Sequence, residues 1–272
     1  MKKFSVTVSN PPFSVGSHGT GKNDYVKFVR KQYELTEDDG MMIAIHPYAM
    51  RREQNKDFYN NNNVTHLSIH SAKEKMFGKD VSTPVEWYVL EKKKRECDMK
   101  VRFTGEEEWS SFNVDKYPFI PNHSLDLLDK FVCTDSNISR LNFIKGNARR
   151  HKTQLKRSEA FDPLKEFSGA YVNIFKTTPD GVSNCYDVKP SSYRNTPKVV
   201  IMESGKYPVY DDKCGVSDQC FWMEVSSKDE ADAIIEYLES DEFTRYCSAC
   251  CLGAQFRVSP DMLNVIPNPH YV

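Results

Sequence analysis

The chain has 272 residues, of which 39% are hydrophobic and 28% are charged, and its formal net charge is −1. This length and composition predict a water-soluble globular protein with one large domain or two modest ones. No apolar run approaches the roughly 18–20 residues that cross a membrane, and no secretory apolar core follows the first residues, so we expect no membrane partner. We expect a cytosolic protein. Because the net charge is near zero, any nucleic-acid partner must meet a local basic patch.

The chain begins with a predicted strand over residues 4–8 that leads into the segment Asn10-Pro11-Pro12-Phe13. The strand residues alternate in character, and the two prolines end the strand in a rigid, exposed turn. Asn10 offers a hydrogen-bond acceptor and a donor, and Phe13 offers a flat face. The turn therefore suits a planar base that carries an exocyclic amine.

This turn resembles a known catalytic motif. Residues 9–13 are similar to the Asn/Asp-Pro-Pro-Phe/Tyr motif of S-adenosylmethionine-dependent N6-adenine DNA methyltransferases, especially those of restriction-modification systems. Residues 39–47 and 81–93 are similar to later strand motifs of that family. Residues 237–243 and 256–267 resemble the close of its DNA-recognition region.

The resemblance implies a mechanism and a set of site residues. A flipped adenine would hydrogen bond through its N6 amine to Asn10 and to the Pro11 carbonyl, while Phe13 stacks on the ring. The amine would attack the methyl group of the cofactor directly, so no metal and no covalent nucleophile is needed. The implied catalytic residues are Asn10, Pro11, Pro12 and Phe13, and the implied cofactor is S-adenosylmethionine. The resemblance also implies a bacterial cell or a phage-infected host as the setting.

Further elements follow within the first hundred residues. Apolar residues at helical spacing predict a crossover helix over residues 24–35, which Gly40 is expected to break. The apolar run 41–45 predicts a parallel strand that is buried on both faces and ends at His46. Since ligands bind beyond the carboxyl ends of such strands, Asn10 and His46 are expected to line one cleft. We assign His46 a structural or base-edge contact, since the implied mechanism needs no histidine. Two more strands are predicted over residues 64–69 and 85–90.

These elements predict an α/β fold with two domains. Residues 1–100 would form the C-terminal half of a Rossmann-like methyltransferase sheet, and residues 101–272 a mixed α+β DNA target-recognition domain. The second part is expected to contain helices over 122–132 and 229–243, strands over 170–175 and 197–202, and a turn at 215–217.

The main basic cluster lies near residues 145–157 and contains no Asp or Glu. Each phosphate that such a segment neutralises releases counterions, so it can supply much of the affinity for double-stranded DNA. A solvated helix face is the alternative interpretation. The residues predicted to bind DNA are Lys145, Arg149, Arg150, Lys152, Lys156 and Arg157.

Residues 16–23 satisfy most of a phosphate-binding loop, with glycine, four residues, glycine and lysine. However, Asn23 stands where a Ser or Thr would bind magnesium, and Pro11 and Pro12 separate the strand from the glycines. We therefore interpret the segment as a loop over the active site.

Eight cysteines raise the question of a zinc site. Cys214 and Cys220 could join Cys247 and Cys250, but the first pair is more widely spaced than zinc ligands usually are. Reduced, partly buried thiols and no metal are expected.

The chain lacks one part of the sequence pattern of this family. The strand that carries the catalytic motif in the family is preceded by units that bind S-adenosylmethionine, and we find no such motif before or after residues 4–8. The cofactor-binding residues are therefore unknown. A strand that is central in the complete sheet would become an edge, so we expect a second chain with the cofactor-binding half to cover it, or a homodimer.

Three functions remain open from the sequence. The preferred one is a DNA adenine-N6 methyltransferase, or its catalytic and target-recognition part. If the cofactor-binding half is a separate chain, the protein would be active only together with that partner. The second is a non-enzymatic DNA-binding protein or subunit. The third and most distant is a phosphate-loop nucleotide-binding protein, in which Lys22→Ala would abolish magnesium-dependent nucleotide binding.

Overall fold

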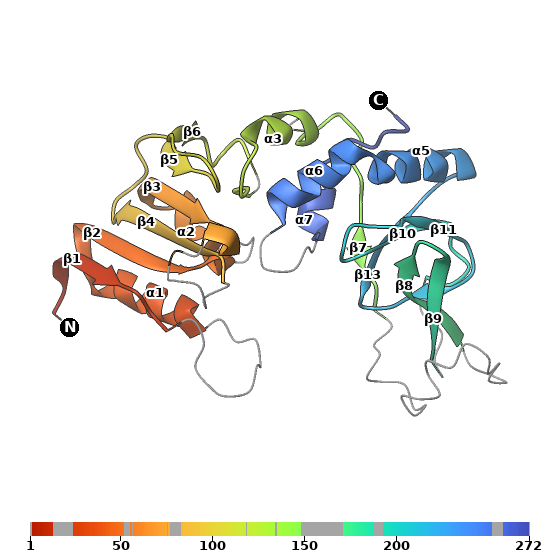
Figure 1. The fold of residues 1–272 in the computed structure, drawn as a ribbon, viewed down its shortest axis with the longest axis horizontal. Coiled ribbons are helices and arrows are strands. Elements are labelled where there is room, and N and C mark those ends of the chain that lie inside the picture. Colours follow the sequence, from red (N-terminus) through yellow and green to blue (C-terminus); the bar gives the residue numbers. More distant parts are fainter. Residues whose placement is uncertain are drawn as a thin grey trace. The chain divides into compact units, whose positions relative to one another are not determined.

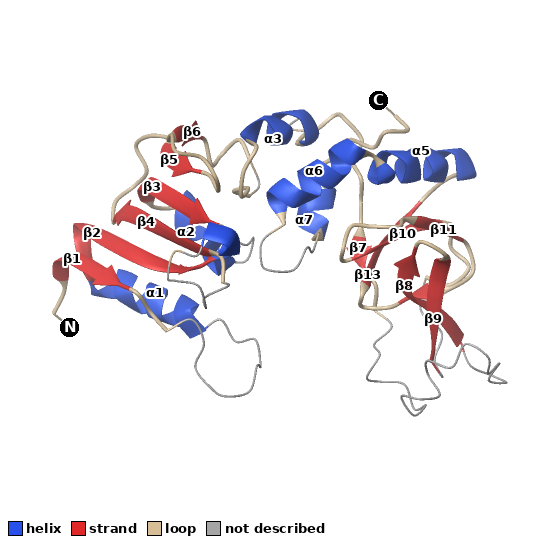
Figure 2. Ribbon diagram, viewed as in Figure 1, coloured by secondary structure: helices blue, strands red, loops and turns tan. Residues whose placement is uncertain are grey.

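A computed structural model describes residues 2–12, 24–51, 55, 57–74, 76, 83–117, 119–133, 135–147, 171–187, 193–251 and 258–271 (Figure 1). The chain divides into two compact units. Unit 1 comprises residues 1–128 and 249–255, and unit 2 comprises residues 129–248 and 256–272. Both units mix helices with strands (Figure 2), as expected for an α/β chain followed by an α+β region.

Unit 1 is built on a six-stranded sheet of order β1-β2-β4-β3-β5-β6. Strands β1 and β2 are parallel, as are β3 and β5, whereas β4 runs antiparallel to both of its neighbours. The strands are β1 (Phe4–Ser9), β2 (Thr36–Pro47), β3 (Asn63–His70), β4 (Val85–Glu91), β5 (Met99–Arg102) and β6 (Ser110–Phe112). The helical elements are α1 (Asp24–Leu35), η1 (Tyr48–Arg51), α2 (Asp57–Asn60) and η3 (Ala72–Glu74). Helix α3 (Leu125–Phe131) begins in unit 1 and ends in unit 2.

Most predicted elements of unit 1 are present. The crossover helix over residues 24–35 is confirmed as α1, and each predicted strand is confirmed within one to five residues of its expected ends. The division predicted after residue 100 falls inside the six-stranded sheet, because β5 pairs with β3 and extends it to β6. The catalytic and DNA-recognition roles of the two parts stay predictions.

Gly40 does not break the helix, and that prediction was wrong. Helix α1 ends at Leu35, and Gly40 lies inside β2 where the pairing with β1 shifts between Phe4 and Val6. A Cβ at Gly40 would stand 3.0 Å from the carbonyl oxygen of Ser5. Glycine is therefore used here for the close approach of two strands.

The two faces of the sheet differ in burial. Helix α1 packs against β1 and β2, on the face that carries Met42, Ala44 and His46, all of which are buried. On the opposite face, Met41 is 37% exposed, and Ile43 beside it is half-buried. The prediction that residues 41–45 are buried on both faces was therefore wrong for one face.

Unit 2 contains two smaller sheets and a group of helices. A four-stranded sheet has the order β11-β10-β13-β7, and a three-stranded sheet has the order β12-β8-β9. The strands are β7 (Ile144–Lys145), β8 (Tyr171–Thr178), β9 (Gly181–Asp187), β10 (Lys198–Met202), β11 (Val209–Asp211), β12 (Gly215–Val216) and β13 (Cys220–Glu224). The helices are α5 (Lys228–Glu239), α7 (Pro260–Leu263) and α6 (Asp241–Cys250), of which α6 belongs to unit 2 up to Ser248.

Two predictions in unit 2 need correction. The turn predicted at residues 215–217 contains strand β12, which pairs in parallel with β8. The single helix predicted over residues 229–243 is two helices, because Ser240 has an extended backbone that ends α5. Its hydroxyl then accepts a hydrogen bond from the Phe243 backbone N–H and so caps the start of α6.

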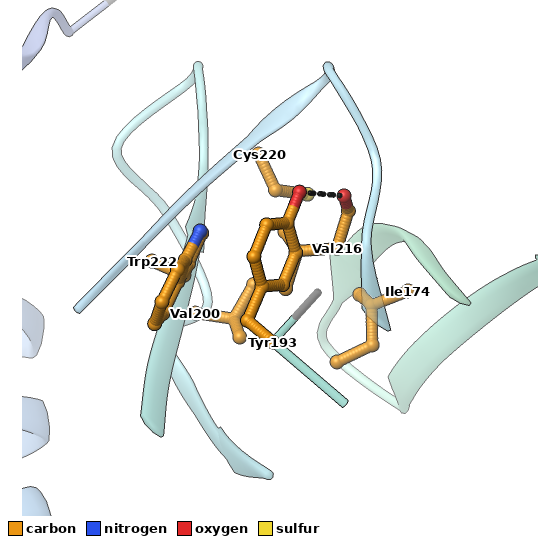
Figure 3. Close-up of a cluster of buried hydrophobic side chains, with 6 residues drawn as sticks. All are labelled: Ile174, Tyr193, Val200, Val216, Cys220 and Trp222. Atoms are coloured by element: carbon orange, nitrogen blue, oxygen red, sulfur yellow. Dashed lines mark hydrogen bonds between the residues drawn. The ribbon is translucent and has the colours of Figure 1, made fainter. Parts of the chain in front are cut away.

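The core between the two small sheets is shown in Figure 3. The Tyr193 and Trp222 rings lie 4.5 Å apart between centroids. The Tyr193 hydroxyl donates a hydrogen bond to the Val216 carbonyl oxygen at 3.2 Å and accepts one from the Asn147 backbone N–H. These contacts hold the main chain at Asn147, the last described residue of the basic segment.

Replacing Gly146 with alanine is expected to destabilise unit 2 by about 1–3 kcal/mol or more. A Cβ there would stand 2.1 Å from the Ser217 carbonyl oxygen and 2.7 Å from that of Val216, so the backbone would have to move. Urea unfolding followed by Trp222 fluorescence would measure the change. Asn147→Ala, at an exposed side chain, is the control and should alter stability by less than about 0.5 kcal/mol. Equal stability of Gly146→Ala and the wild type would contradict this packing.

Candidate active site

The predicted catalytic turn follows directly after β1. Asn10 is exposed, Pro11 is buried and Pro12 is exposed. Phe13 lies outside the described residues. The turn therefore presents the amide of Asn10 to solvent while Pro11 holds the main chain against the protein.

Gln32 of α1 holds the end of β1 in place. The Ser9 hydroxyl donates to the Gln32 side-chain oxygen, and Gln32 Nε2 donates to Thr7 Oγ1 at 3.3 Å. The same nitrogen donates to the carbonyl oxygen of Ile43 in β2 at 3.0 Å. One buried amide thus joins the helix and both parallel strands immediately before Asn10.

His46 lies at the same end of the sheet, because Ser9 of β1 pairs with Ala44 of β2. Its ring is fully buried and stacks on Tyr25 of α1 with 5.4 Å between centroids. Nδ1 is 2.7 Å from the Pro47 carbonyl oxygen, which can only accept, so the proton resides on Nδ1. Nε2 then has an acceptor lone pair with no hydrogen-bond partner among the described residues.

Burial lowers the pKa of His46 below its usual value, and the nearby Glu86 carboxylate opposes that effect without reversing it. The imidazole is therefore neutral at pH 7. A buried, neutral ring stacked on α1 fits the structural role expected for His46.

Glu86 forms a buried ion pair beside His46. It is fully buried in β4 and accepts from Arg51 Nε at 2.5 Å and from the Tyr59 hydroxyl at 2.8 Å. Burial and this carboxylate raise the pKa of Tyr59 well above its usual value, so Tyr59 remains a donor. The carboxylate has two donors, as a buried charge requires.

Arg51 extends the network to a second segment. Its Nη1 donates to the carbonyl oxygens of Ile120 and Pro121 at 3.0 and 3.1 Å, and its Nη2 donates to Asn122 Oδ1 at 3.0 Å. The guanidinium thereby ties residues 120–122 to the sheet.

This network was missed from the sequence. Glu86 stands in an apolar strand at a position that faces the same side as Tyr88, which is buried. A charged residue at an inward position of a buried strand requires a partner. The position of Glu86 in the strand could therefore have indicated a buried ion pair.

The predicted DNA-binding residues lie mostly beyond the described part of unit 2. Arg149, Arg150, Lys152, Lys156 and Arg157 are outside the described residues. Lys145 lies in β7, where its Nζ pairs with Glu203 at 2.8 Å and stands over the Phe221 ring. The charge of Lys145 is therefore already partly neutralised within the protein.

No group of three His, Cys, Asp or Glu in the described residues could hold a metal ion. The phosphate-loop-like residues 16–23 lie outside those ranges. No described helix combines the length and the apolar character that a membrane span requires.

The glycines of the described residues bear on whether S-adenosylmethionine, the cofactor that the sequence resemblance implies, could bind there. Rossmann-type folds hold nucleotide cofactors at a turn in which several glycines let the main chain approach the ligand. Every turn that lies wholly within the described residues carries at most one glycine, and Gly40 and Gly146 both face the protein's own carbonyl oxygens. The three glycines between β1 and α1, at positions 16, 19 and 21, lie outside these ranges. S-adenosylmethionine therefore has no recognisable cradle in these ranges.

Comparison with known proteins places the fold. No protein-family model matches the chain, and no curated protein does. The Type IIL restriction-modification enzyme MmeI, solved in complex with DNA, matches over 95% of this chain and 45% of its own, with a TM-score of 0.54 at 10% identity. The chain thus has the fold of part of a restriction-modification enzyme.

Two other restriction-modification structures match with lower TM-scores. The M protein of the Type I restriction enzyme EcoKI matches 38% of this chain and 26% of its own, with a TM-score of 0.30 at 13% identity. A Type ISP restriction-modification enzyme, LlaGI in complex with a DNA substrate mimic, matches over 96% of this chain and 33% of its own, with a TM-score of 0.47 at 10% identity. This chain spans less than half the length of each of these three proteins.

Proposed function

We propose that this chain is the catalytic and target-recognition part of a DNA adenine-N6 methyltransferase that uses S-adenosylmethionine. The observation that carries the proposal is the exposed amide of Asn10, which follows a strand anchored by Gln32. The turn has the sequence Asn-Pro-Pro-Phe, and the chain shares its fold with part of MmeI, a restriction-modification enzyme.

The turn would contribute to the reaction by positioning the adenine base. Asn10 Oδ1 would accept one hydrogen of the adenine N6 amine, and the Pro11 carbonyl oxygen would accept the other. These bonds orient the amine and free its lone pair, while Phe13 stacks on the base and holds it out of the duplex. S-adenosylmethionine would supply the methyl group.

The contacts of Gln32 support this role, because they fix Ser9 before any base arrives. A site that is already ordered does not need to reorganise when the reaction occurs. The stacked pair of Tyr25 and His46 fixes the start of α1 in the same way.

The basic segment would supply affinity for DNA phosphates. We expect the double variant Arg149→Ala, Arg150→Ala to lower the slope of log affinity against log salt by about 0.9 for each phosphate that the protein no longer neutralises. Lys145→Ala is the comparison, and it should change the slope less because Lys145 is paired with Glu203. Fluorescence anisotropy with a DNA duplex at several salt concentrations measures both. An unchanged slope in the double variant would contradict a phosphate-binding role.

Labelled methyl transfer tests the proposal itself. The chain, purified from its own cells with any bound partner, is incubated with methyl-labelled S-adenosylmethionine and DNA, and the nucleosides are then separated. Label on N6-methyladenine is the expected result. Label on cytosine would contradict the proposal, and DNA binding without any label would favour a non-enzymatic DNA-binding protein.

A further inference from the structure

The loop that joins β10 to β11, residues 203–208, holds an aromatic residue in an unfavourable backbone conformation. Tyr207 has a φ of 55°, in the left-handed region, and is 41% exposed. The other described non-glycine residues with positive φ are short and polar: Asp39, Ser124 and Asn195. Short polar residues such as Asn and Asp enter this region with little strain, whereas a bulky residue rarely does. Tyr207 therefore costs the fold free energy that a glycine at this position would not.

The residues before Tyr207 are anchored to the rest of unit 2. The Lys206 carbonyl oxygen accepts a hydrogen bond at 3.1 Å from the hydroxyl of Thr177, which is buried in β8. Gly205 packs so closely on Val258 that a Cβ at Gly205 would stand 2.8 Å from the valine side chain. These contacts leave the main chain little freedom, so the exposed Tyr207 ring is presented from a fixed position.

The exposed groups of this loop suit a polyanion. Lys206 is exposed beside Tyr207, and neither side chain has a hydrogen-bond or ion-pair partner among the described residues. The single carboxylate of the loop belongs to Glu203, and it pairs at 2.8 Å with Lys145 of the basic segment. The unpaired charge of the loop is therefore positive, and the loop begins where the basic segment begins.

Stability does not explain why a tyrosine occupies this position. Among the described residues its ring makes no ring contact, and its hydroxyl has no hydrogen-bond partner. Backbone strain of this kind persists where the side chain serves a ligand. In DNA, phosphates bind lysine and fix the position of a protein, whereas base edges in the grooves carry the sequence. A fixed tyrosine offers a base edge both an apolar ring and a hydroxyl that donates and accepts.

We propose that Tyr207 contacts a base pair of the DNA target while Lys206 binds a neighbouring phosphate, so that the β10–β11 loop helps to set the sequence that the protein recognises. This inference deepens the proposed function and rests on it, because unit 2 is there the target-recognition part. Loss of the ring should relax the sequence preference locally and leave the phosphate contacts in place.

Selection from a library of DNA duplexes with a random central segment tests the contact. The protein, purified from its own cells, selects duplexes, and sequencing gives the preference for each base at each position. Tyr207→Gly should lower that preference by about fivefold or more at one or two adjacent positions, which is the usual effect of one mismatched base pair. Affinity for a duplex of unrelated sequence should change less than about twofold. Lys206→Ala should weaken binding to selected and unrelated duplexes by the same factor.

Two further variants separate the side chain from the backbone. Glycine adopts positive φ without strain, so Tyr207→Gly should unfold at a urea concentration at least as high as the wild type, which excludes misfolding as the cause of a lost preference. Tyr207→Ala removes the ring but keeps a restricted backbone, and it should relax the same positions. Tyr271→Ala is the matched control, at a tyrosine of unit 2 that is 57% exposed, and it should leave every position unchanged.

An unchanged sequence preference in Tyr207→Gly would overturn the base contact, as would a wild-type protein that selects no sequence or equal relaxation in Tyr271→Ala. The proposed function fails separately. A preference that depends on Tyr207, without methyl transfer to adenine, rejects the methyltransferase and keeps the role of the loop. Adenine methylation within the same sequence by Tyr207→Gly and by the wild type keeps the methyltransferase and rejects the role of the loop.

Discussion

Replacing Asn10 with alanine is expected to lower the rate of methyl transfer to DNA by about a hundredfold or more. The variant lacks the side-chain oxygen that would hold the adenine amine, while β1 and its contacts with Gln32 stay in place. DNA affinity should therefore remain within about twofold of the wild type, since phosphate contacts supply most of it. Single-turnover kinetics with methyl-labelled S-adenosylmethionine, on protein purified from its own cells, would measure the rate.

Asn10→Asp is the matched control for this experiment. Aspartate keeps an acceptor oxygen at the same place, and the motif that this turn resembles accepts either residue, so this variant should retain more activity than Asn10→Ala. Circular dichroism would establish that both variants are folded. A full rate in Asn10→Ala would place the chemistry elsewhere.

Replacing Glu86 with alanine should destabilise unit 1 by about 3–5 kcal/mol, because it leaves the Arg51 guanidinium buried without its carboxylate. Arg51 is only 2% exposed at its side chain and Glu86 is 0% exposed, so water cannot replace the missing carboxylate. The Tyr59 hydroxyl would be deprived of its acceptor at the same time.

The measurement needs a signal from unit 1 alone. Two of the three tryptophans, Trp87 and Trp109, lie in unit 1, so urea unfolding by fluorescence in a Trp222→Phe background reports on that unit. Glu91→Ala is the control on the same strand. Glu91 is 32% exposed at its side chain and pairs with Lys93, so its removal should cost about 1 kcal/mol or less. Equal costs for the two variants would mean that the buried pair contributes little.

Local patterns in the sequence were sufficient to predict most of unit 1. The helical spacing of residues 24–35 predicted α1 correctly, because the helix buries Tyr25 and Val29. The alternation of residues 4–8 predicted a strand correctly, although its apolar residues Phe4, Val6 and Val8 are exposed. The motif at Asn10 was placed correctly at the end of its strand. Its assignment to adenine chemistry is still a prediction.

The errors came from features that depend on distant residues. Gly40 was interpreted from its low helix propensity, whereas its role is the close approach to Ser5. The exposure of Met41 could not be inferred from an apolar run, since such a run does not show which face lacks a covering element. The break at Ser240 could have been found, because Ser followed by Asp241 and Glu242 is a helix-start pattern.

Mapping N6-methyladenine across the genome of the source cells by single-molecule sequencing tests most directly whether this chain directs methylation of adenine at N6. Cells that carry the wild-type chain should show methylated adenine within one defined sequence. That signal should disappear in cells carrying Asn10→Ala at an equal protein level. Persistence of every methylated sequence in the Asn10→Ala cells would contradict the claim.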